Sequence, residues 1–303
     1  MPPIPFITTE GVVSSCVGPA PHLYYAEVSG WFRRHCPRLL LLVGYFMFRY
    51  QLSYLTILLL SVTCSVVGAE PRGWRMTDEF AASEAKQAAA ADEKFVYVVT
   101  NDRVAKYDRV TKQLLAHSSG EAKHLNSALV AGGRIYLAHS NFPTKPERSE
   151  IFVLDAESMK LETFHDFGNF GGSLTWCVLR NDEWWCNFAL YGSDNRRTFL
   201  VRFDRNWKET GRWTYPPQVL DRIGGASISG GIWHEDTLLV SDHDNRRLYR
   251  LELPKIGGVL EFVAEEQAPI TGQGFAYDPK TGGLIGIDRA RRKVLFFEPI
   301  NKR

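Results

Sequence analysis

The sequence predicts an all-β fold over residues 70–303: a β-propeller of five four-stranded blades, closed by an N-terminal strand. One pattern repeats along the chain, in which a small-residue strand, a turn, an apolar strand and a polar loop precede a strand that ends in Asp. Its period of roughly 40 to 50 residues is typical of propeller blades. Apolar and β-branched runs bounded by turn residues favour strands, and no segment carries a convincing helical stripe.

The repeats are expected over 87–119, 125–167, 171–215, 229–263 and 272–298. Asp108, Asp155 and Asp204 recur at the end of the third strand of the first three repeats. The fifth repeat stops after three strands, which would leave an exposed sheet edge. We expect Trp74 to Phe80 to supply the missing outer strand, so that the two ends of the domain are neighbours.

Residues 47–69 have the three parts of a secretory signal peptide. Arg49 precedes an apolar stretch from Leu52 to Val67, and the small residues Gly68 and Ala69 follow it. We expect cleavage near Ala69 and export of the propeller to a periplasmic, extracellular or lumenal compartment. Residues 1–46 show no clear periodicity and are interpreted as an unstructured leader, or as a mis-assigned one if translation starts at Met47.

An uncleaved membrane anchor is the alternative to the signal peptide. Leu39 to Phe46 and Leu52 to Val67 together approach the run of about 20 apolar residues that a membrane-spanning helix needs. In that case too the propeller lies outside the cytoplasm, and the N-terminal segment is its only contact with the membrane. The segment's cleavage is left open by the sequence.

Charge argues against nucleic acid as a partner. The net charge of +2 comes from the first 69 residues, and the rest of the chain holds 32 basic and 32 acidic residues. Proteins that bind nucleic acid normally carry a basic footprint, which is missing here. We expect a monomer whose partner is a small molecule or a glycan.

Two cysteines, Cys177 and Cys186, lie within the expected propeller. A two-residue hairpin turn at Asn181 and Asp182 would place them directly opposite each other, about 4.5 Å apart at Cα and within disulfide reach. An exported domain with an even number of cysteines favours a disulfide. Two buried free thiols, packed as small apolar groups, are the other interpretation.

The repeat pattern of residues 70–303 resembles that of the gluconolactonase-like, NHL-like and YVTN-type propellers, and this resemblance implies a fold more than an activity. Gln273 and Gly274, in the segment ITGQGFAYDP, resemble the threonine-glutamine-glycine segment of the plant-type glutaminyl cyclases. Those enzymes are also five-bladed. The lactonase-like sites rely on Glu, Asn and Asp, and no Glu occupies the corresponding place here.

Propeller geometry predicts where a site would lie, because the starts of innermost strands and the ends of second strands meet at one face. We call it the channel face. Loop ends of a rigid scaffold often carry function. Besides Asn101, the predicted ligand-binding residues there are Gln87, Asn126, Asn141, Ser173, Asn187, Tyr191, Ser229, Gln273, Asp288 and Arg289.

Histidines on the same face suggest chemistry. His124, His139, His243 and Asp242 are the candidate catalytic residues, since imidazole accepts and donates protons near neutral pH. A divalent metal is a candidate cofactor, with the ligands drawn from His124, His139, His243 and Asp244. The alternative is that the SDHDN segment is a polar loop and that the other two histidines are satisfied by hydrogen bonds between blades.

No signature of nucleophilic serine or cysteine chemistry, of a zinc protease or of a nucleotide-binding loop is found. The sequence therefore predicts an exported propeller that binds a small polar ligand at its channel face, with hydrolase, lactonase or cyclase-type activity as candidates. The alternative is a non-catalytic propeller that binds a protein or a glycan there. The substrate cannot be read from a fold.

Overall fold

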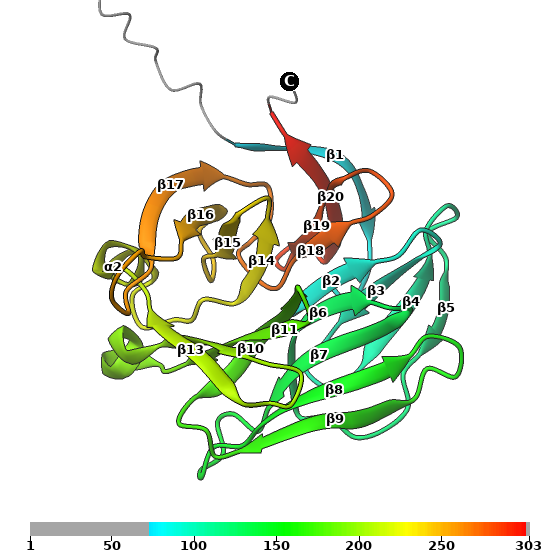
Figure 1. Cartoon of the computed structure of the whole chain (residues 1–303). Helices are drawn as coiled ribbons and strands as arrows, with labels where there is room; N and C mark the ends of the chain where they lie inside the picture. The colour runs from blue at the N-terminus through cyan, green and yellow to red at the C-terminus, as the bar shows by residue number, and fades with distance from the viewer. Residues whose placement is uncertain (1–72, 301–303) are drawn as a thin grey trace, which may run out of the picture. The chain divides into compact units, whose positions relative to one another are not determined.

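The computed structural model describes residues 73–300, which form five four-stranded sheets. All neighbouring strands within a sheet are antiparallel. The sheets are arranged around a common centre as the blades of a propeller (Figure 1). The prediction of an all-β, five-bladed propeller is confirmed.

Each of the first four blades uses four consecutive strands, numbered from the centre outward. Blade 1 contains β2 (Ala88–Ala91), β3 (Phe95–Val99), β4 (Val104–Asp108) and β5 (Leu114–His117). Blade 2 contains β6 (His124–Ala131), β7 (Arg134–Ser140), β8 (Ser149–Asp155) and β9 (Leu161–Gly168). Blade 3 contains β10 (Ser173–Arg180), β11 (Glu183–Ala189), β12 (Phe199–Phe203) and β13 (Glu209–Thr214). Blade 4 contains β14 (Gly230–His234), β15 (Thr237–Ser241), β16 (Arg247–Glu252) and β17 (Glu261–Gln267).

Blade 5 joins the two ends of the described chain. Its strands are β18 (Ala276–Asp278), β19 (Gly283–Asp288), β20 (Lys293–Pro299) and, outermost, β1 (Trp74–Ala81). The register runs from Trp74 opposite Pro299 to Ala81 opposite Lys293. β1 lies beside β20 in Figure 1. The predicted closure of the ring by the strand from Trp74 to Phe80 is therefore confirmed.

Small residues on the innermost strands let the blades meet at the centre. A Cβ atom at Gly274 would lie 2.7 Å from the Cβ of Ala88 and 2.9 Å from the Cα of Ser127. A Cβ atom at Gly230 would lie 3.0 Å from the Cα of Gly274. These distances are shorter than van der Waals contact. The inner strands of blades 1, 2, 4 and 5 therefore require alanine, serine and glycine where they approach one another.

The recurring aspartates shape the turns between third and fourth strands. Asp108 Oδ1 accepts hydrogen bonds from the backbone N–H groups of Val110 and Thr111, at 2.9 and 2.7 Å. Asp155 Oδ1 accepts them in the same way from Glu157 and Ser158, at 3.2 and 2.8 Å. This is the local side-chain bonding that favours Asp in turns. The repeat of Asp is thus a signal of fold.

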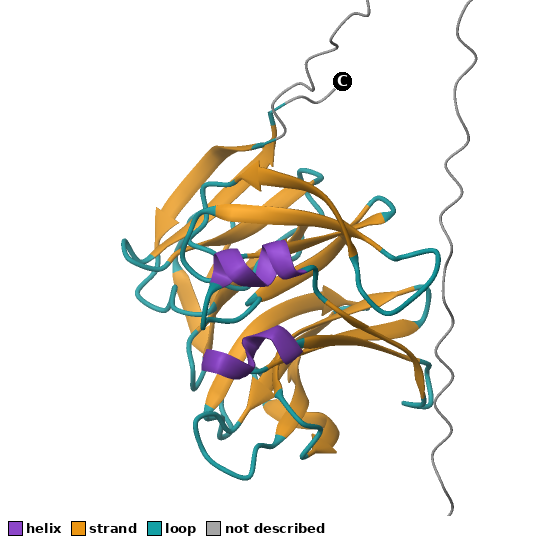
Figure 2. Ribbon diagram, turned by 90° about the vertical axis from the view of Figure 1, so that its left-hand side faces the viewer, coloured by secondary structure: helices purple, strands orange, loops and turns teal. Residues whose placement is uncertain are grey.

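Within residues 73–300, two short helical segments interrupt the strands (Figure 2). They are the 3₁₀ helix η2 (Gly192–Arg197) and the α-helix α2 (Pro217–Ile223). The sequence carries no convincing helical stripe at these positions, yet both segments are helical. Helix α2 has Pro at its first position, where proline is favoured in helices. Its buried residues are Val219, Leu220 and Ile223, and over so few residues the helical spacing cannot be distinguished from that of an apolar strand.

Cys177 and Cys186 lie directly opposite each other on β10 and β11, as the hairpin turn at Asn181 and Asp182 predicts. Both turn residues have positive φ, 54° and 61°, the conformation that a two-residue hairpin requires. Both cysteines are buried free thiols. The predicted disulfide is therefore corrected to the alternative of packed thiols, and burial raises the pKa of Cys177 to about 12.

The signal peptide, the alternative anchor and the leader fall on residues 1–69, outside the described residues. Within 73–300, none of the helices is both long enough and apolar enough to cross a bilayer.

Candidate functional site

The channel face is held together by hydrogen bonds between neighbouring blades. Gly274 N donates to Gln87 O at 2.9 Å, and Leu125 N donates to Asn101 O at 2.8 Å. The side chain of Gln87 donates to the side chain of Asn101. Gln273 Nε2 donates to the backbone oxygen of His243 at 2.9 Å. The predicted meeting of strand starts and second-strand ends is therefore present over blades 4, 5, 1 and 2.

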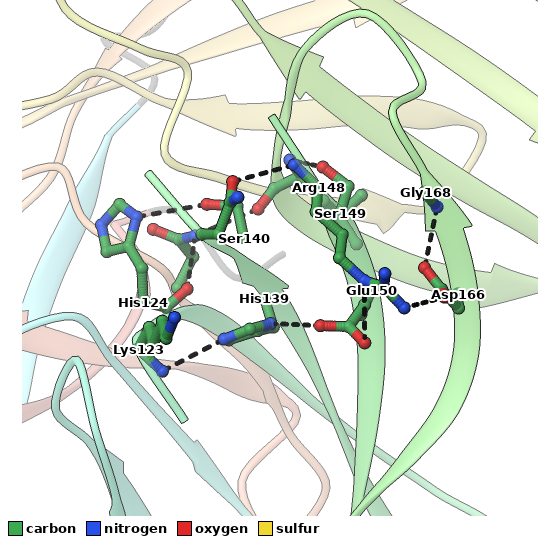
Figure 3. A network of polar contacts seen from close by, with 12 residues as sticks. Lys123, His124, His139, Ser140, Arg148, Ser149, Glu150, Asp166 and Gly168 are labelled. Carbon is green, nitrogen blue, oxygen red and sulfur yellow. Dashed lines mark hydrogen bonds and ion pairs between the residues drawn. The ribbon is translucent and has the colours of Figure 1, made fainter. Parts of the chain in front are cut away.

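His124 stands at the start of β6 on this face and is half-buried. Its Nδ1 lies 3.2 Å from Ser140 Oγ (Figure 3). Its ring is 5.5 Å from the ring of Phe142. Burial lowers the pKa of His124, and the positive charge of Arg289 lowers it further. His124 is therefore a neutral imidazole near pH 7, able to accept a proton.

The connection between β7 and β8 brings an aromatic side chain toward blade 3. Phe142, 37% exposed, packs against Tyr191 with 4.5 Å between ring centres. Burial raises the pKa of Tyr191 to about 12, partly opposed by the neighbouring hydroxyls of Ser173 and Ser227, while the charge of Glu147 raises it. Sequence reasoning named Tyr191 and Ser173 but missed Phe142 and Glu147. An aromatic residue in the polar segment SNFPTKPERS was the available signal.

His139 is only 5% exposed and has partners at both ring nitrogens. Nε2 accepts a hydrogen bond from the backbone N–H of Lys123 at 3.1 Å, and Nδ1 lies 3.1 Å from Glu150 Oε2 (Figure 3). This network places the proton on Nδ1. The ring also stacks on Phe152 at 4.3 Å. We therefore correct the assignment of His139 from a catalytic residue to a residue that joins β6, β7 and β8.

The pKa of His139 is lowered to about 4, mainly by burial and further by His124 and Lys123. The unfolded imidazole, with a pKa of about 6.5, takes up a proton between pH 6.5 and 4 while the folded one does not. We expect the stability contributed by His139 to be complete above this range and to fall by up to about 1.4 kcal/mol per pH unit within it. Urea unfolding at pH 7 and pH 5 measures this. Between pH 7 and pH 5, the free energy of unfolding should fall less for the His139→Gln variant than for the wild type. An equal fall in both proteins would contradict the structural role given to His139.

A groove of about 540 Å³ lies beside His124, where blade 1 meets blade 2. Seven of its ten lining residues are polar or charged, and they include Lys123, His139, Asn141 and Glu150. Asn141 stabilises the connection between β7 and β8, because its Oδ1 accepts a hydrogen bond from the backbone N–H of Arg148 at 2.8 Å. The groove is large enough for a small ligand and suited to a polar one.

Asn187 and Asn126 serve the fold. Asn187 is fully buried, donates to Thr175 Oγ1 at 2.8 Å and accepts from the hydroxyl of Tyr215 at 2.7 Å. Asn126 Nδ2 donates to the backbone oxygen of Leu174 at 3.0 Å and so ties blade 2 to blade 3. We remove Asn187 from the ligand-binding set. Ser229, also buried, shares a contact of 3.0 Å with Ser227.

Asp242 is 1% exposed and accepts from the hydroxyl of Tyr249 at 2.9 Å and from Asn245 Nδ2 at 3.0 Å. A buried carboxylate with these partners has no access to a substrate, so its catalytic assignment is corrected. Asp288 is fully buried too. Its Oδ2 pairs with Arg246 at 2.9 Å and with Arg291 at 2.8 Å, which removes it from the ligand-binding set.

The four metal-ligand candidates do not form a metal site. His243 Nδ1 lies 2.5 Å from Asp244 Oδ2, but His139 is occupied by Lys123 and Glu150. In the part of the chain that the structure describes, no group of three or more His, Cys, Asp and Glu side chains could hold a metal ion. The four candidate ligands are therefore not brought together within residues 73–300.

Two cations on the channel face stand out by their lack of partners. Among residues 73–300, no hydrogen bond or ion pair reaches the guanidinium of half-buried Arg289, whose backbone N–H donates to Thr271 Oγ1 at 2.8 Å. The same holds for the ammonium of Lys123. Arg289 lowers the pKa of His124, and Lys123 lowers that of His139. The groove itself is lined by three acidic residues, Asp102, Glu121 and Glu150, and by two basic ones, Lys123 and Arg148. The unpaired positive charge near His124 is therefore that of half-buried Arg289 and of exposed Lys123.

No family model matches the sequence, and no curated protein matches it. Among solved structures, the crystal structure of Myxococcus xanthus glutaminyl cyclase is similar, with a TM-score of 0.50 and 10% identity, covering 76% of this chain and 98% of that chain. A crystal structure of the mitotic checkpoint complex is similar at a TM-score of 0.42 and 11% identity, over 69% of this chain and 73% of that chain.

The likeness to the glutaminyl cyclase concerns the fold. It agrees with the resemblance carried by Gln273 and Gly274, which lie where blade 5 meets blade 1. Membership of the gluconolactonase-like, NHL-like or YVTN-type groups stays a prediction.

Proposed function

We propose that this protein binds a small polar ligand with an anionic group, such as a carboxylate or a phosphate, at the channel face. The observation that carries the proposal is the pair of unpartnered cations, Arg289 and Lys123, around His124 and beside a groove of about 540 Å³. A guanidinium held half-buried without a carboxylate gains most from an anion supplied by a ligand, because charge-assisted hydrogen bonds are the stronger ones.

The proposal extends to catalysis through His124. A cyclase- or hydrolase-type reaction needs a group that removes a proton near neutral pH, and the lowered pKa of His124 keeps its imidazole in the accepting form. Ser140, 3.2 Å from Nδ1, orients the ring. The similarity to a glutaminyl cyclase makes cyclisation of an N-terminal glutamine one reaction to test. Export of the protein is part of the same proposal.

Arg289→Ala and Lys123→Ala are expected to weaken binding of an anionic ligand about tenfold each, since each removes one charge-assisted contact. Isothermal titration with inorganic phosphate, L-glutamate and gluconate measures this. Arg134→Ala is the matched control, because Arg134 is exposed and lies at the other end of blade 2, in the hairpin between β6 and β7. Equal affinities for Arg289→Ala and the wild type, or no binding of any of the three anions, would refute the proposal.

Turnover is tested separately with a glutaminyl dipeptide, by ammonia release, and with gluconolactone, by acid release. His124→Gln should retain anion binding but lose turnover. If neither compound is turned over by the wild type while anions still bind, the non-catalytic alternative replaces the enzymatic one.

A further inference from the structure

Phe142 and Tyr191 extend the channel face away from His124. The ring centre of Phe142 lies 5.5 Å from that of His124 and 4.5 Å from that of Tyr191. Phe142 lies between β7 and β8 and Tyr191 follows β11, so blades 2 and 3 both contribute. We propose that Tyr191 donates a hydrogen bond to the ligand while Phe142 packs against its apolar part. This inference rests on the function proposed above and adds the class of ligand: an elongated organic anion with an apolar middle and an uncharged acceptor.

The hydroxyl of Tyr191 is a donor without an acceptor. Burial raises its pKa to about 12 and the charge of Glu147 adds to this, while the hydroxyls of Ser173 and Ser227 act in the opposite direction. The phenol is therefore protonated at neutral pH. The serine hydroxyls lower the pKa by donating to the phenol oxygen, and no side chain or carbonyl among residues 73–300 accepts the phenol proton. That proton is available to a ligand.

Ser173 gives a second reason for a ligand at this position. Its Oγ is fully buried without a hydrogen-bond partner, and it is the one hydroxyl in that state among residues 73–300. Tyr191 beside it is only half-buried, and its hydroxyl keeps contact with solvent. Buried polar groups are nearly always hydrogen-bonded in native proteins. When Tyr191 donates to a ligand, its oxygen becomes a stronger acceptor for Ser173, because hydrogen bonds in a chain polarise one another.

Phe142 supplies the apolar surface. Of the large apolar side chains that are exposed among residues 73–300, Phe142 alone lies in a connection at the channel face, and it is 37% exposed. Its loop is held in place by Asn141, whose Nδ2 donates to Pro146 O at 2.9 Å and whose Oδ1 accepts from Arg148 N at 2.8 Å. Covering a fixed ring with a hydrocarbon segment removes its surface from water, which is favourable.

The charged end of the ligand belongs at Arg289. Burial lowers the pKa of His124 and the positive charge of Arg289 lowers it further, so the guanidinium lies near the His124 ring. Successive contacts therefore lead from Arg289 through His124 and Phe142 to Tyr191. A carboxylate at Arg289, a hydrocarbon segment over Phe142 and a carbonyl oxygen at Tyr191 match this order. Inorganic phosphate occupies only the first position.

Keto acids test the acceptor. Levulinate and its longer homologues are each compared with the carboxylate of the same chain length that lacks the ketone, such as pentanoate. Isothermal titration should show a keto acid bound about fivefold more tightly than its matched carboxylate. This preference should disappear in Tyr191→Phe and remain in Tyr277→Phe. Tyr277 is the matched tyrosine, because it is 51% exposed and lies on β18 opposite Leu284, at the end of blade 5 away from Arg289.

Phe142→Ala tests the apolar part, with Phe164→Ala as its control. Phe164 has nearly the same exposure, 38%, but lies on the outer strand β9. The wild type should bind pentanoate about tenfold more tightly than acetate, because the longer chain covers Phe142. Phe142→Ala should lose most of this gain, and Phe164→Ala should keep it.

Inorganic phosphate is titrated in parallel, because it needs only the cationic end of the site. The inference would be overturned if phosphate binds but no keto acid is preferred, if the preference persists in Tyr191→Phe, or if pentanoate binds no more tightly than acetate. Each of these results leaves the proposed anion site standing. If neither phosphate nor any carboxylate binds to the wild type, the inference and the function proposed above are both refuted.

Discussion

A chain that begins at Ala82, and so lacks β1, is expected to lose its cooperative thermal unfolding transition. The deletion removes Trp74 and Phe80, which are 5% and 8% exposed, and uncovers Phe296 and Phe297 on β20. Burial of one large aromatic side chain contributes about 1.5 to 3 kcal/mol. Several such losses approach the whole stability of a typical domain, about 5 to 15 kcal/mol.

The loss of stability extends beyond blade 5, because residues of β1 and the residue before it also contact blade 4. Trp74 Nε1 donates to Glu266 Oε2 on β17 at 2.8 Å, and Gly73 pairs with Gln267 on the same strand. The ion pair between Arg75 and Glu298 is exposed and adds little. Removing β1 thus opens the ring at the junction of blades 4 and 5 as well as leaving an unpaired edge on β20.

Circular dichroism during heating measures the effect, with a chain that begins at Gly73 as the control. That control keeps β1 and should unfold in one sharp transition. A synthetic peptide of residues 73–81 should restore the transition when added to the shortened chain, because an open edge accepts an added strand. A shortened chain that melts within a few degrees of the control would show that β1 does not close the ring.

The sequence predicted the blades well because repetition amplifies a weak signal. Each repeat combines turn residues with alternating strands, and the hairpin at Asn181 and Asp182 sets its own register, so the positions of Cys177 and Cys186 followed directly. The closure by β1 could be inferred because a missing fourth strand leaves an edge that has to be paired. Helix α2 was missed because seven residues are too few for a helical period to be distinguished.

The site was less predictable because the same residue types build turns and bind ligands. Asp242 and Asp288 occur at second-strand ends, as ligand-binding residues would, but they are buried and accept hydrogen bonds from Asn245 and Arg291 of their own loops. His124 and His139 look alike in the sequence and differ in burial and partners. Only tertiary contacts distinguish a free cation such as Arg289 from a paired one such as Arg246.

Gly272→Ala is expected to destabilise the protein by about 3 to 5 kcal/mol, as the sum of backbone strain and overpacking. Gly272 has φ of +75°, and a Cβ atom there would lie 2.1 Å from the backbone oxygen of Asp242. The contact cannot be relieved by rotating a side chain, since its partner is backbone. Either the segment before β18 or the loop of Asp242 has to move.

Gly224→Ala separates the two contributions, because Gly224 has φ of +66° and no atom within 4 Å of the added Cβ. Its ψ of −135° places it in a region that glycine occupies almost alone, so the variant carries the cost of this backbone conformation without a close contact, about 1 to 3 kcal/mol. Urea unfolding of both variants therefore measures the close approach by difference, and equal destabilisation would show that the blades have room to separate. Gly272 precedes Gln273, whose side chain donates to His243 O at 2.9 Å. The same substitution should consequently shift the backbone of His243 on the channel face, because the glycine is what allows blades 4 and 5 to meet there.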